Sequence, residues 1–260
     1  MSQESHACAT VQRTIEELTL NAWPALQTVL YDGWLLRFAE GYTRRANSVN
    51  PIYPSAVPLA DKIAACERAY AARDQDAVFK ITDAADLSGL DAALEQRGYQ
   101  REATTSVQTC ALATLEVGFD LAVAVAPALT GDWLDDFCQL TGTDERHQRT
   151  MRTMIEAIGP VPAFATLRDG RGRALAVGLA VAERDYVGLF DVATAAPARN
   201  QGTGRRLVGH LLAWGRAQGA RTGHLAVVAD NTPALRLYAC LGFREAYRYW
   251  YRRQARQPHA

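Results

Sequence analysis

The strongest constraint on the fold is an alternation of short apolar runs with helix-spaced segments in the C-terminal half. Ala174–Ala182 and Tyr186–Ala193 are apolar runs separated by three polar residues, a spacing typical of a β-hairpin. Thr203–Gln218 has the apolar spacing of an amphipathic helix and is followed by Gly219, a common helix stop. The pattern therefore predicts an α/β fold, a mixed sheet covered by helices. Further strands are expected at Leu121–Val125, Phe164–Leu167, His224–Val228 and Ala246–Arg252, and further helices at Trp133–Leu140, Arg146–Ile158 and 232–241.

Composition and charge exclude several classes of protein. The 260 residues include 48% hydrophobic and 22% charged residues, which is ordinary for a chain with a buried core. The 28 basic residues balance the 28 acidic ones, and no long basic patch is present, so we expect no nucleic-acid partner. No apolar segment approaches the roughly 18 residues that span a bilayer, and the N-terminus lacks a signal-peptide pattern. We therefore expect a cytoplasmic protein without a membrane partner.

The cysteines and histidines give no metal-binding pattern. The five cysteines form no Cys-x-x-Cys pair, and the five histidines form no His-x-x-x-His pair on a helical stretch. The odd number and wide spacing of the cysteines also argue against a disulfide framework. We expect a metal-free protein with reduced thiols at Cys8, Cys66, Cys110, Cys138 and Cys240.

The two halves of the chain share a short pattern. Asp91–Tyr99 and Leu235–Phe243 each contain a helix-spaced segment, then a glycine and an aromatic residue, and each follows an apolar strand. Two explanations stay open: a duplicated architecture that has diverged, or a chance similarity between amphipathic helices. Under the first explanation we expect two domains, residues 1–116 and residues 117–260, with the seam at Ala113–Glu116.

The most informative segment for function is Asp191–Gly204, in which a strand enters a glycine-containing loop and then a helix. The first turn of a helix has unsatisfied N–H groups and a partial positive charge. Gly202 and Gly204 leave room for an anion to approach those groups. The segment therefore predicts an anion site that suits a pyrophosphate.

Two other phosphate-binding patterns fit this segment poorly. Phosphoryl transfer by a P-loop requires Gly-Lys-Ser/Thr, whereas Arg205 and Arg206 follow the last glycine. A dinucleotide site requires a small residue at position 207, which is a leucine here, and an acidic residue about 20 positions later. Asp230 comes too late for that role. A nicotinamide or flavin oxidoreductase is therefore a disfavoured alternative.

The segment resembles a known acetyl-CoA signature. Arg199, Gly202 and Gly204, after a strand that ends at Thr194, are similar to the Arg-x-x-Gly-x-Gly signature of the GNAT superfamily of N-acetyltransferases. A second stretch, 231–243, resembles a further signature of the same superfamily. The resemblance covers about residues 121–253. It implies a GNAT fold in the C-terminal half, and with the internal pattern it implies a tandem, degenerate GNAT-like N-terminal half.

The resemblance also implies roles in binding acetyl-CoA, the expected cosubstrate. Backbone groups at the end of the strand would bind the thioester arm, and an amide of Val192 or Ala193 would polarise the acetyl carbonyl. Asn231 would contact the pantetheine arm, although a simple helix N-cap is the alternative. The full set of expected cosubstrate-binding residues is Val192, Ala193, Thr194, Arg199, Asn200, Gln201, Gly202, Thr203, Gly204, Arg205, Asn231 and Tyr238.

Two residues are expected to act in catalysis. Tyr238 would protonate the departing thiolate, unless it is a core tyrosine. Some relatives use a glutamate as the base, but the matching position is Gly188. Asp191 is the nearest acidic residue, and it would take the proton of the amine through a water or attract the cationic substrate. Other polar residues are candidates for the acceptor site, each with a solvated or turn-stabilising role as the alternative: Asp144, Glu145, His147, Glu183, Arg44, Arg45 and Asn47.

These features together predict an acetyl-CoA-dependent N-acetyltransferase. The absence of a cysteine from the expected acetyl-binding strand favours direct attack of a primary amine in a ternary complex. The acceptor, a small-molecule or peptide amine, is left open, as is the choice between monomer and homodimer. The main alternative is a GNAT-fold protein that binds and senses acyl-CoA without catalysis.

Overall fold

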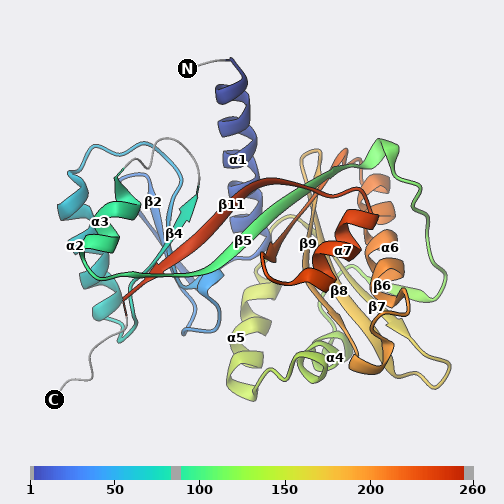
Figure 1. Ribbon diagram of the computed structural model, residues 1–260. Helices are drawn as coiled ribbons and strands as arrows, with labels where there is room; N and C mark the ends of the chain where they lie inside the picture. Colours follow the sequence, from blue (N-terminus) through green and yellow to red (C-terminus); the bar gives the residue numbers. More distant parts are fainter. Residues whose placement is uncertain (1–2, 83–88, 255–260) are drawn as a thin grey trace. The chain divides into compact units, whose positions relative to one another are not determined.

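The chain forms two compact units, and a computed structural model describes residues 3–82 and 89–254 (Figure 1). The first unit comprises the described residues up to Glu17, Ala25–Ser106 and those from Tyr247 onwards. The second comprises Leu18–Pro24 and Val107–Ala246. Three elements contribute residues to both units: α1 (Gln3–Ala22), β5 (Gln100–Ala111) and β11 (Arg244–Arg253).

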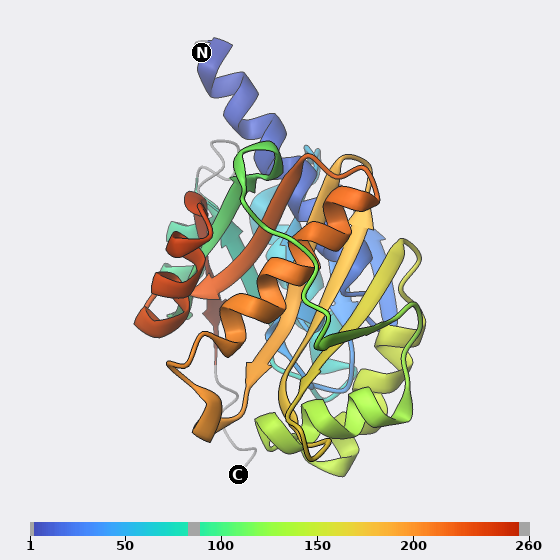
Figure 2. The ribbon, with the colours of Figure 1, turned by 90° about the vertical axis from the view of Figure 1, so that its right-hand side faces the viewer.

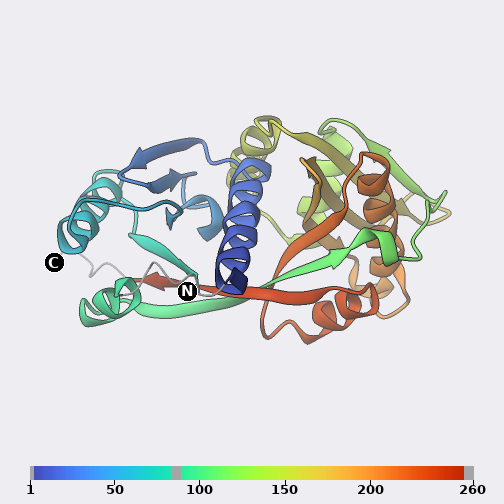
Figure 3. The same ribbon diagram turned by 90° about the horizontal axis from the view of Figure 1, so that it is seen from above.

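The first unit contains a sheet with two helices on one face (Figure 3). Its other elements are β1 (Gln27–Tyr31), β2 (Trp34–Phe38), a 3-10 turn (Arg44–Ala46), β3 (Val49–Pro51), α2 (Leu59–Ala71), β4 (Val78–Thr82) and α3 (Leu90–Gln96). Antiparallel pairs join β1 to β2, β2 to β3 and β4 to β11, and β3 runs parallel to β4. The rings of Trp34, Phe79 and Tyr99 meet edge to face beneath α2 and α3, where they form the centre of this core.

The opposite face of this sheet is buried but polar. Lys80 of β4 lies opposite Tyr251 in the sheet register, so both point to this face. Glu16 of α1 accepts hydrogen bonds from Lys80 Nζ (2.5 Å) and from the Tyr247 hydroxyl (2.7 Å). Burial and the adjacent Glu16 carboxylate raise the pKa of Tyr247, so its hydroxyl stays a donor. Such pairing is what allows charged groups to be buried.

The second unit carries a sheet with helices on both faces. Its remaining elements are a 3-10 turn (Leu112–Thr114), β6 (Val123–Ala126), α4 (Gly131–Thr141), α5 (Glu145–Glu156), β7 (Val161–Arg168), β8 (Ala174–Glu183), β9 (Tyr186–Thr194), a 3-10 turn (Ala196–Ala198), α6 (Thr203–Ala217), β10 (Thr222–Val228) and α7 (Thr232–Cys240). Antiparallel pairs join β6 to β7, β7 to β8 and β8 to β9, and β9 runs parallel to β10.

Alternation along the strands of the second unit assigns the helices to the two faces. Ala163 and Ala165 of β7 belong to the core that α6 covers, whereas Phe164 between them contacts the ring of Trp133 in α4. Successive residues of a strand point to opposite faces, so α4 and α6 lie on opposite sides of the sheet. Figure 2 shows α6 running across the strands on the side that faces the viewer.

Most predicted elements of the C-terminal half are present. The hairpin forms between β8 and β9, with Glu183 opposite Tyr186, and the predicted helix at 203–218 is α6. One strand begins earlier than predicted, because β7 starts at Val161 and includes Pro162. Proline is tolerated there because β6 pairs only with residues 164–167 of β7, so no strand needs the missing N–H of Pro162 on that side.

Two N-terminal elements, α1 and β1, were not predicted. The strand β1 is exposed over most of its length and, among the strands that the structure describes, pairs with β2 alone, so it lacks the apolar alternation that marks a buried strand. The boundaries of the two units also differ from the expected single boundary at residue 116. After the short stretch Leu18–Pro24, the chain enters the second unit again at Val107 and returns to the first at Tyr247, because β4 takes its partner from the last strand of the chain.

The repeated sequence pattern corresponds to a repeated helix end. In α3 the N–H of Tyr99 donates to the carbonyl of Leu94, and in α7 the N–H of Phe243 donates to the carbonyl of Tyr238. Gly98 (φ 85°) and Gly242 (φ 76°) supply the left-handed residue that this cap requires. Both helices also stand between two strands, β4 and β5 or β10 and β11.

Candidate functional site

The parallel strands β9 and β10 separate toward their carboxyl ends. Their register runs from Tyr186 opposite Thr222 to Leu189 opposite Leu225, although β9 continues to Thr194. Beyond Leu189 the backbone of β9 therefore has no strand partner on the β10 side within the described residues. This separation leaves amide and carbonyl groups at the end of β9 available to a ligand.

A β-bulge lies in the same stretch of β9. Ala193 pairs with Val177, whereas Phe190 pairs with Leu179, so Asp191 and Val192 together stand opposite the single residue Gly178. Asp191 has a φ of 50°, in the left-handed region that a side chain rarely adopts. Bulges turn a strand and commonly occur next to active sites. The bulge includes Val192, one of the residues that the sequence predicts to bind the thioester arm, and Asp191, one of the two residues expected to act in catalysis.

The N-terminus of α6 is an open set of backbone donors. Gly202 caps the helix with a φ of 78° and supplies no side-chain cap. The first backbone bond of the helix is donated by Arg206 to the carbonyl of Gly202. In the described part of the chain, the N–H groups of residues 202–205 donate to no acceptor. A methyl group built at Gly202 would meet no atom within 4 Å, so an anion has room to approach these groups.

Three elements converge beside this turn. A β-carbon at Gly204 would lie 2.8 Å from the side chain of Leu237 in α7 and 3.4 Å from Oγ1 of Thr194 in β9. Only glycine permits the start of α6 to come so close to both neighbours. The end of β9, the start of α6 and the middle of α7 thus meet at Thr194, Gly204 and Leu237.

The loop before α6 is held by its own side chains. Arg199 Nε donates to the carbonyl of Thr194 (3.2 Å), and Gln201 Nε2 donates to the carbonyl of Pro197 (2.7 Å). Arg206, by contrast, forms an ion pair with Asp120 (2.7 Å). The adjacent Arg205 is exposed and forms no ion pair among the described residues. Of the two neighbouring arginines, Arg205 is therefore the one with its charge available to an anion.

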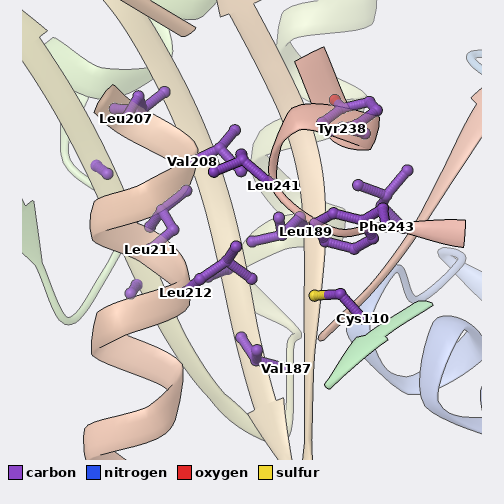
Figure 4. Packing of buried hydrophobic residues seen from close by; sticks show 14 of the residues in the cluster. Cys110, Val187, Leu189, Leu207, Val208, Leu211, Leu212, Tyr238, Leu241 and Phe243 are labelled. Atoms are coloured by element: carbon purple, nitrogen blue, oxygen red, sulfur yellow. The ribbon is translucent and has the colours of Figure 1, made fainter. Parts of the chain in front are cut away.

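Tyr238 lies on α7 at the edge of the α6 core (Figure 4). The side chain is 9% exposed, and its ring meets that of Phe243 edge to face at 5.7 Å. Burial raises the pKa of Tyr238 to about 12, so the phenol is protonated at neutral pH. Its hydroxyl has no hydrogen-bond partner among the described residues. Tyr238 is thus a core residue through its ring, while its hydroxyl remains available as a donor.

Asn231 is a helix cap, as one of the two interpretations predicted. Its Oδ1 accepts a hydrogen bond from the N–H of Ala234 at 3.2 Å, which satisfies one of the open donors of α7. The side-chain amide group of Asn231 forms no further bond among the described residues. Capping the helix therefore leaves the Asn231 donor free for a ligand.

The residues weighed for the acceptor site have structural partners. Asp144 caps α5 and accepts the N–H of His147 (2.8 Å), a bond that lowers the pKa of Asp144. Glu183 accepts a bond from Asn21 at 3.0 Å. In the first unit, Asn47 binds four backbone groups of its own turn, and Arg44 pairs with Glu102. These contacts fit the solvated or turn-stabilising roles that were the alternatives for these residues. Of the two remaining candidates, Glu145 lies in the first turn of α5, and the backbone carbonyl of Arg45 accepts a hydrogen bond from the Arg37 side chain.

One buried residue next to the β9 and β10 separation was missed. His224 on β10 stands opposite Gly188 in the register, and its side chain is 3% exposed. The sequence presents it only as a histidine at the start of an apolar run. The register between two strands far apart in sequence is needed to place it beside Gly188.

The described residues contain no helix long and apolar enough to cross a bilayer. In the same residues, no group of three or more His, Cys, Asp or Glu side chains is arranged to hold a metal ion.

Comparison with known proteins assigns the chain to a family. A family model described as "Probable histone acetyltransferase Rv0428c C-terminal" matches residues 10–252. The chain is also 28% identical over 247 residues to a Bacillus subtilis (strain 168) protein named "Uncharacterized N-acetyltransferase YobR". That match covers 92% of this chain and 97% of the relative.

Two solved structures have a similar fold. A GCN5-related N-acetyltransferase from Kribbella flavida gives a TM-score of 0.67 at 16% identity and covers 94% of this chain and 96% of that chain. A tandem GNAT protein from the clavulanic acid biosynthesis pathway gives a TM-score of 0.65 at 15% identity, with 94% and 88% covered. Since the family model spans nearly the whole chain, the protein belongs to this family and is an acetyltransferase with a GNAT-type fold.

Proposed function

We propose that this acetyltransferase transfers the acetyl group of acetyl-CoA to a primary amine by direct attack in a ternary complex. The observation that carries the proposal is the convergence of an open helix N-terminus, at residues 202–205, with the separated end of β9. The first feature suits a diphosphate, and the second offers backbone groups to a thioester arm. An extended ligand with both parts, such as acetyl-CoA, fits the pair.

The start of α6 would bind the diphosphate. Its open N–H groups and the helix dipole favour an anion, and the space above Gly202 admits one. Arg205 and Arg199 would add charge, while the amides of Asn200, Gln201, Thr203 and Gly204 would complete the site. The free amide group of Asn231 would bind the pantetheine arm.

The end of β9 would activate the acetyl carbonyl. Backbone groups of Val192, Ala193 and Thr194 would align the thioester arm, and an N–H of Val192 or Ala193 would donate to the carbonyl oxygen. A donor already in place lowers the energy of the negative charge that develops on that oxygen. The bulge at Asp191 and Val192 turns these groups out of the regular β8 pairing.

Tyr238 would donate a proton to the departing thiolate. Its raised pKa keeps the hydroxyl protonated at neutral pH. The hydroxyl is therefore in the donor form when the C–S bond breaks. Asp191, at the bulge beside the acetyl site, would attract the cationic amine before attack.

We also infer that the N-terminal unit is a GNAT-like copy that cannot carry out the reaction. The matching helix caps of α3 and α7 support a duplication, as does the likeness to a tandem GNAT protein. Leu94 stands where α7 has Tyr238, so this copy has no phenol for the leaving thiolate. The description of the matched family names histones, which makes a protein lysine one of the candidate acceptors.

Release of coenzyme A tests the proposal. The full chain would be supplied with acetyl-CoA and one of four probes: a histone-tail peptide, Nα-acetyl-lysine amide, spermidine or an aminoglycoside. We expect release of free thiol that depends on one of these amines, together with the acetylated amine by mass spectrometry. Absence of coenzyme A binding in a calorimeter would overturn the proposed donor site. Binding without transfer to any amine would favour the sensing alternative.

A further inference from the structure

The loop that precedes α2 in the first unit matches the loop that precedes α6 in the second. In each unit a strand leads through a loop into a helix, and the chain then returns in a strand parallel to the first. These elements are β3, α2 and β4 in one unit, and β9, α6 and β10 in the other. The loop at residues 52–58 therefore stands where the second unit has its open N–H groups.

The helix caps align the two loops residue by residue. Pro58 caps α2 as Gly202 caps α6, and neither cap forms a side-chain hydrogen bond. Counted back from each cap, the residues at 56–57 match those at 200–201. The amides at 200–201 are among those proposed above to bind the diphosphate. The amides at 56–57 are thus the matching donors of the first unit.

A carboxylate of the chain itself binds these two donors. The N–H of Val57 donates to Oδ2 of Asp32 at 2.9 Å, and the N–H of Ala56 lies 3.1 Å from both carboxylate oxygens. These bonds, that from Val57 most strongly, lower the pKa of Asp32, so the group is ionised at neutral pH. A carboxylate and a phosphate offer the same kind of charged acceptor to a backbone N–H.

A buried ammonium lies on the other side of this carboxylate. The Lys62 side chain is 0% exposed, and its Nζ donates to Oδ2 of Asp32 at 3.0 Å and to the Asp32 carbonyl. The same Nζ lies 4.2 Å from the centre of the Trp34 ring. Burial lowers the pKa of Lys62, and the Asp32 carboxylate opposes that change. A buried ammonium is stable only beside a counter-charge, so this position selects an anion.

The turn between β1 and β2 delivers the carboxylate. It consists of Asp32 (φ 43°) and Gly33 (φ 79°), an Asp-Gly pair suited to a tight hairpin. The Gly33 carbonyl accepts the N–H groups of Ile52 (3.3 Å) and Tyr53 (3.0 Å). A β-carbon at Gly33 would lie 2.6 Å from the carbonyl oxygen of Tyr53, so only glycine lets the turn come this close.

Almost no donor of the loop remains for an external ligand. Pro54 and Pro58 have no N–H, and the Asp32–Gly33 turn accepts those of four other loop residues. In the part of the chain that the structure describes, Ser55 alone within 52–58 has an N–H without an acceptor. The first unit therefore differs from the second, in which the N–H groups at 202–205 stay open.

We propose that Asp32 is a built-in ligand of an anion site in the first unit, where it holds the position that a free diphosphate would otherwise take. The site consists of the N–H groups of Ala56 and Val57 and the ammonium of Lys62. Tethering by the turn gives the carboxylate a high effective concentration, so a free anion competes poorly.

Removal of the carboxylate should open the site. Asp32→Gly is the suitable variant, because glycine adopts a φ of 43° without strain and leaves the two amides and Lys62 in place. Calorimetry with inorganic pyrophosphate at pH 7 counts the sites on the full chain. We expect Asp32→Gly to bind one more pyrophosphate per chain than the wild type. An equal count, in a variant with the near-UV circular dichroism of the wild type, would overturn the proposal.

Asp61→Ala is the matched control. Asp61 is exposed in the first turn of α2 and forms no hydrogen bond or ion pair within residues 3–82 and 89–254. The substitution removes the same charge from the same helix start without opening the two amides. It should therefore leave the count at that of the wild type. A gain in this variant too would assign the binding to net charge and contradict the proposal.

A measurement on the wild type keeps the test independent of how the variants fold. Pyrophosphate at pH 7 should leave the amide NMR resonances of Ala56 and Val57 unmoved, because Asp32 already holds both N–H groups. Movement of either resonance would show that a free anion reaches the position, and would overturn the proposal. A wild type that binds no pyrophosphate at all would instead count against the donor site proposed at α6, so the two failures are distinguishable.

Discussion

The hydroxyl of Tyr238 is the residue-scale feature on which the proposed chemistry depends most. We expect Tyr238→Phe to lower kcat about 100-fold while the affinity for coenzyme A is little changed, because the ring packing against Phe243 survives the substitution. Steady-state kinetics and calorimetry measure the two quantities. Tyr99→Phe is the matched control, since it removes a phenol that bonds to Glu67 in the other unit. A wild-type rate in Tyr238→Phe would exclude the residue from the reaction.

A second residue-scale prediction concerns stability against pH. Burial alone lowers the pKa of His224 from 6.5 to about 4. Between these values the unfolded chain binds a proton that the folded chain does not. The free energy of unfolding should therefore fall as the pH falls from 6.5 toward 4, by on the order of 3 kcal/mol. Above pH 6.5 the residue should make no pH-dependent contribution.

Denaturant unfolding of the wild type and of His224→Gln measures this effect. The free energy of unfolding of the variant should lack this fall between pH 6.5 and pH 4, whatever the stability of the variant at pH 7. Equal slopes for the two proteins would show that the ring titrates normally and is not shielded from water in the fold.

At the scale of elements, the proposed cosubstrate site depends on the first turn of α6. We expect Gly202→Glu to lower the affinity for coenzyme A at least 100-fold, because its carboxylate would compete for the open N–H groups and repel a diphosphate. Gly172→Glu is the control for backbone strain. Gly172 has a φ of 80°, close to the 78° of Gly202, and both positions are open to a side chain. Calorimetry should show normal binding for the control, and normal binding for Gly202→Glu would refute the anion site.

At the scale of the whole molecule, the course of the chain determines which fragments fold. Residues 1–116 lack β11, which pairs with β4 through Lys80 and Tyr251. They also lack Arg252, whose guanidinium pairs with Asp91 at 2.7 Å. We therefore expect residues 1–116 alone to remain unfolded, as judged by poor dispersion of their amide NMR spectrum.

Rejoining the missing strand should restore folding of this unit. Residues 1–116 joined by a long flexible Gly/Ser linker to residues 244–260 should give a dispersed spectrum and a cooperative transition. A cooperative fold in residues 1–116 alone would favour a domain boundary at that position, and would contradict the assignment of the last strand to the first unit.

Local patterns identified much of this molecule because they depend on neighbours in the sequence. The apolar spacing of Thr203–Gln218 and the two runs flanking Glu183 specify a helix and a hairpin through short-range contacts alone. The glycine at 202 likewise marks a helix start whose N–H groups are open. The first residues of β7, with Pro162, and the exposed strand β1 were not predicted, because the pairing of both depends on which strands lie beside them.

The sequence by itself determined the element types of the C-terminal half, the glycine-containing loop that enters α6 and the resemblance to an acetyltransferase superfamily. These properties follow from periodicity and from backbone groups within a few residues of each other. Only the tertiary structure decided that β4 takes its partner from the end of the chain, that Asp191 lies in a bulge, and that His224 fills the space beside Gly188. Those facts depend on the register between strands far apart in the chain, which is set by the packing of whole faces rather than by local preference.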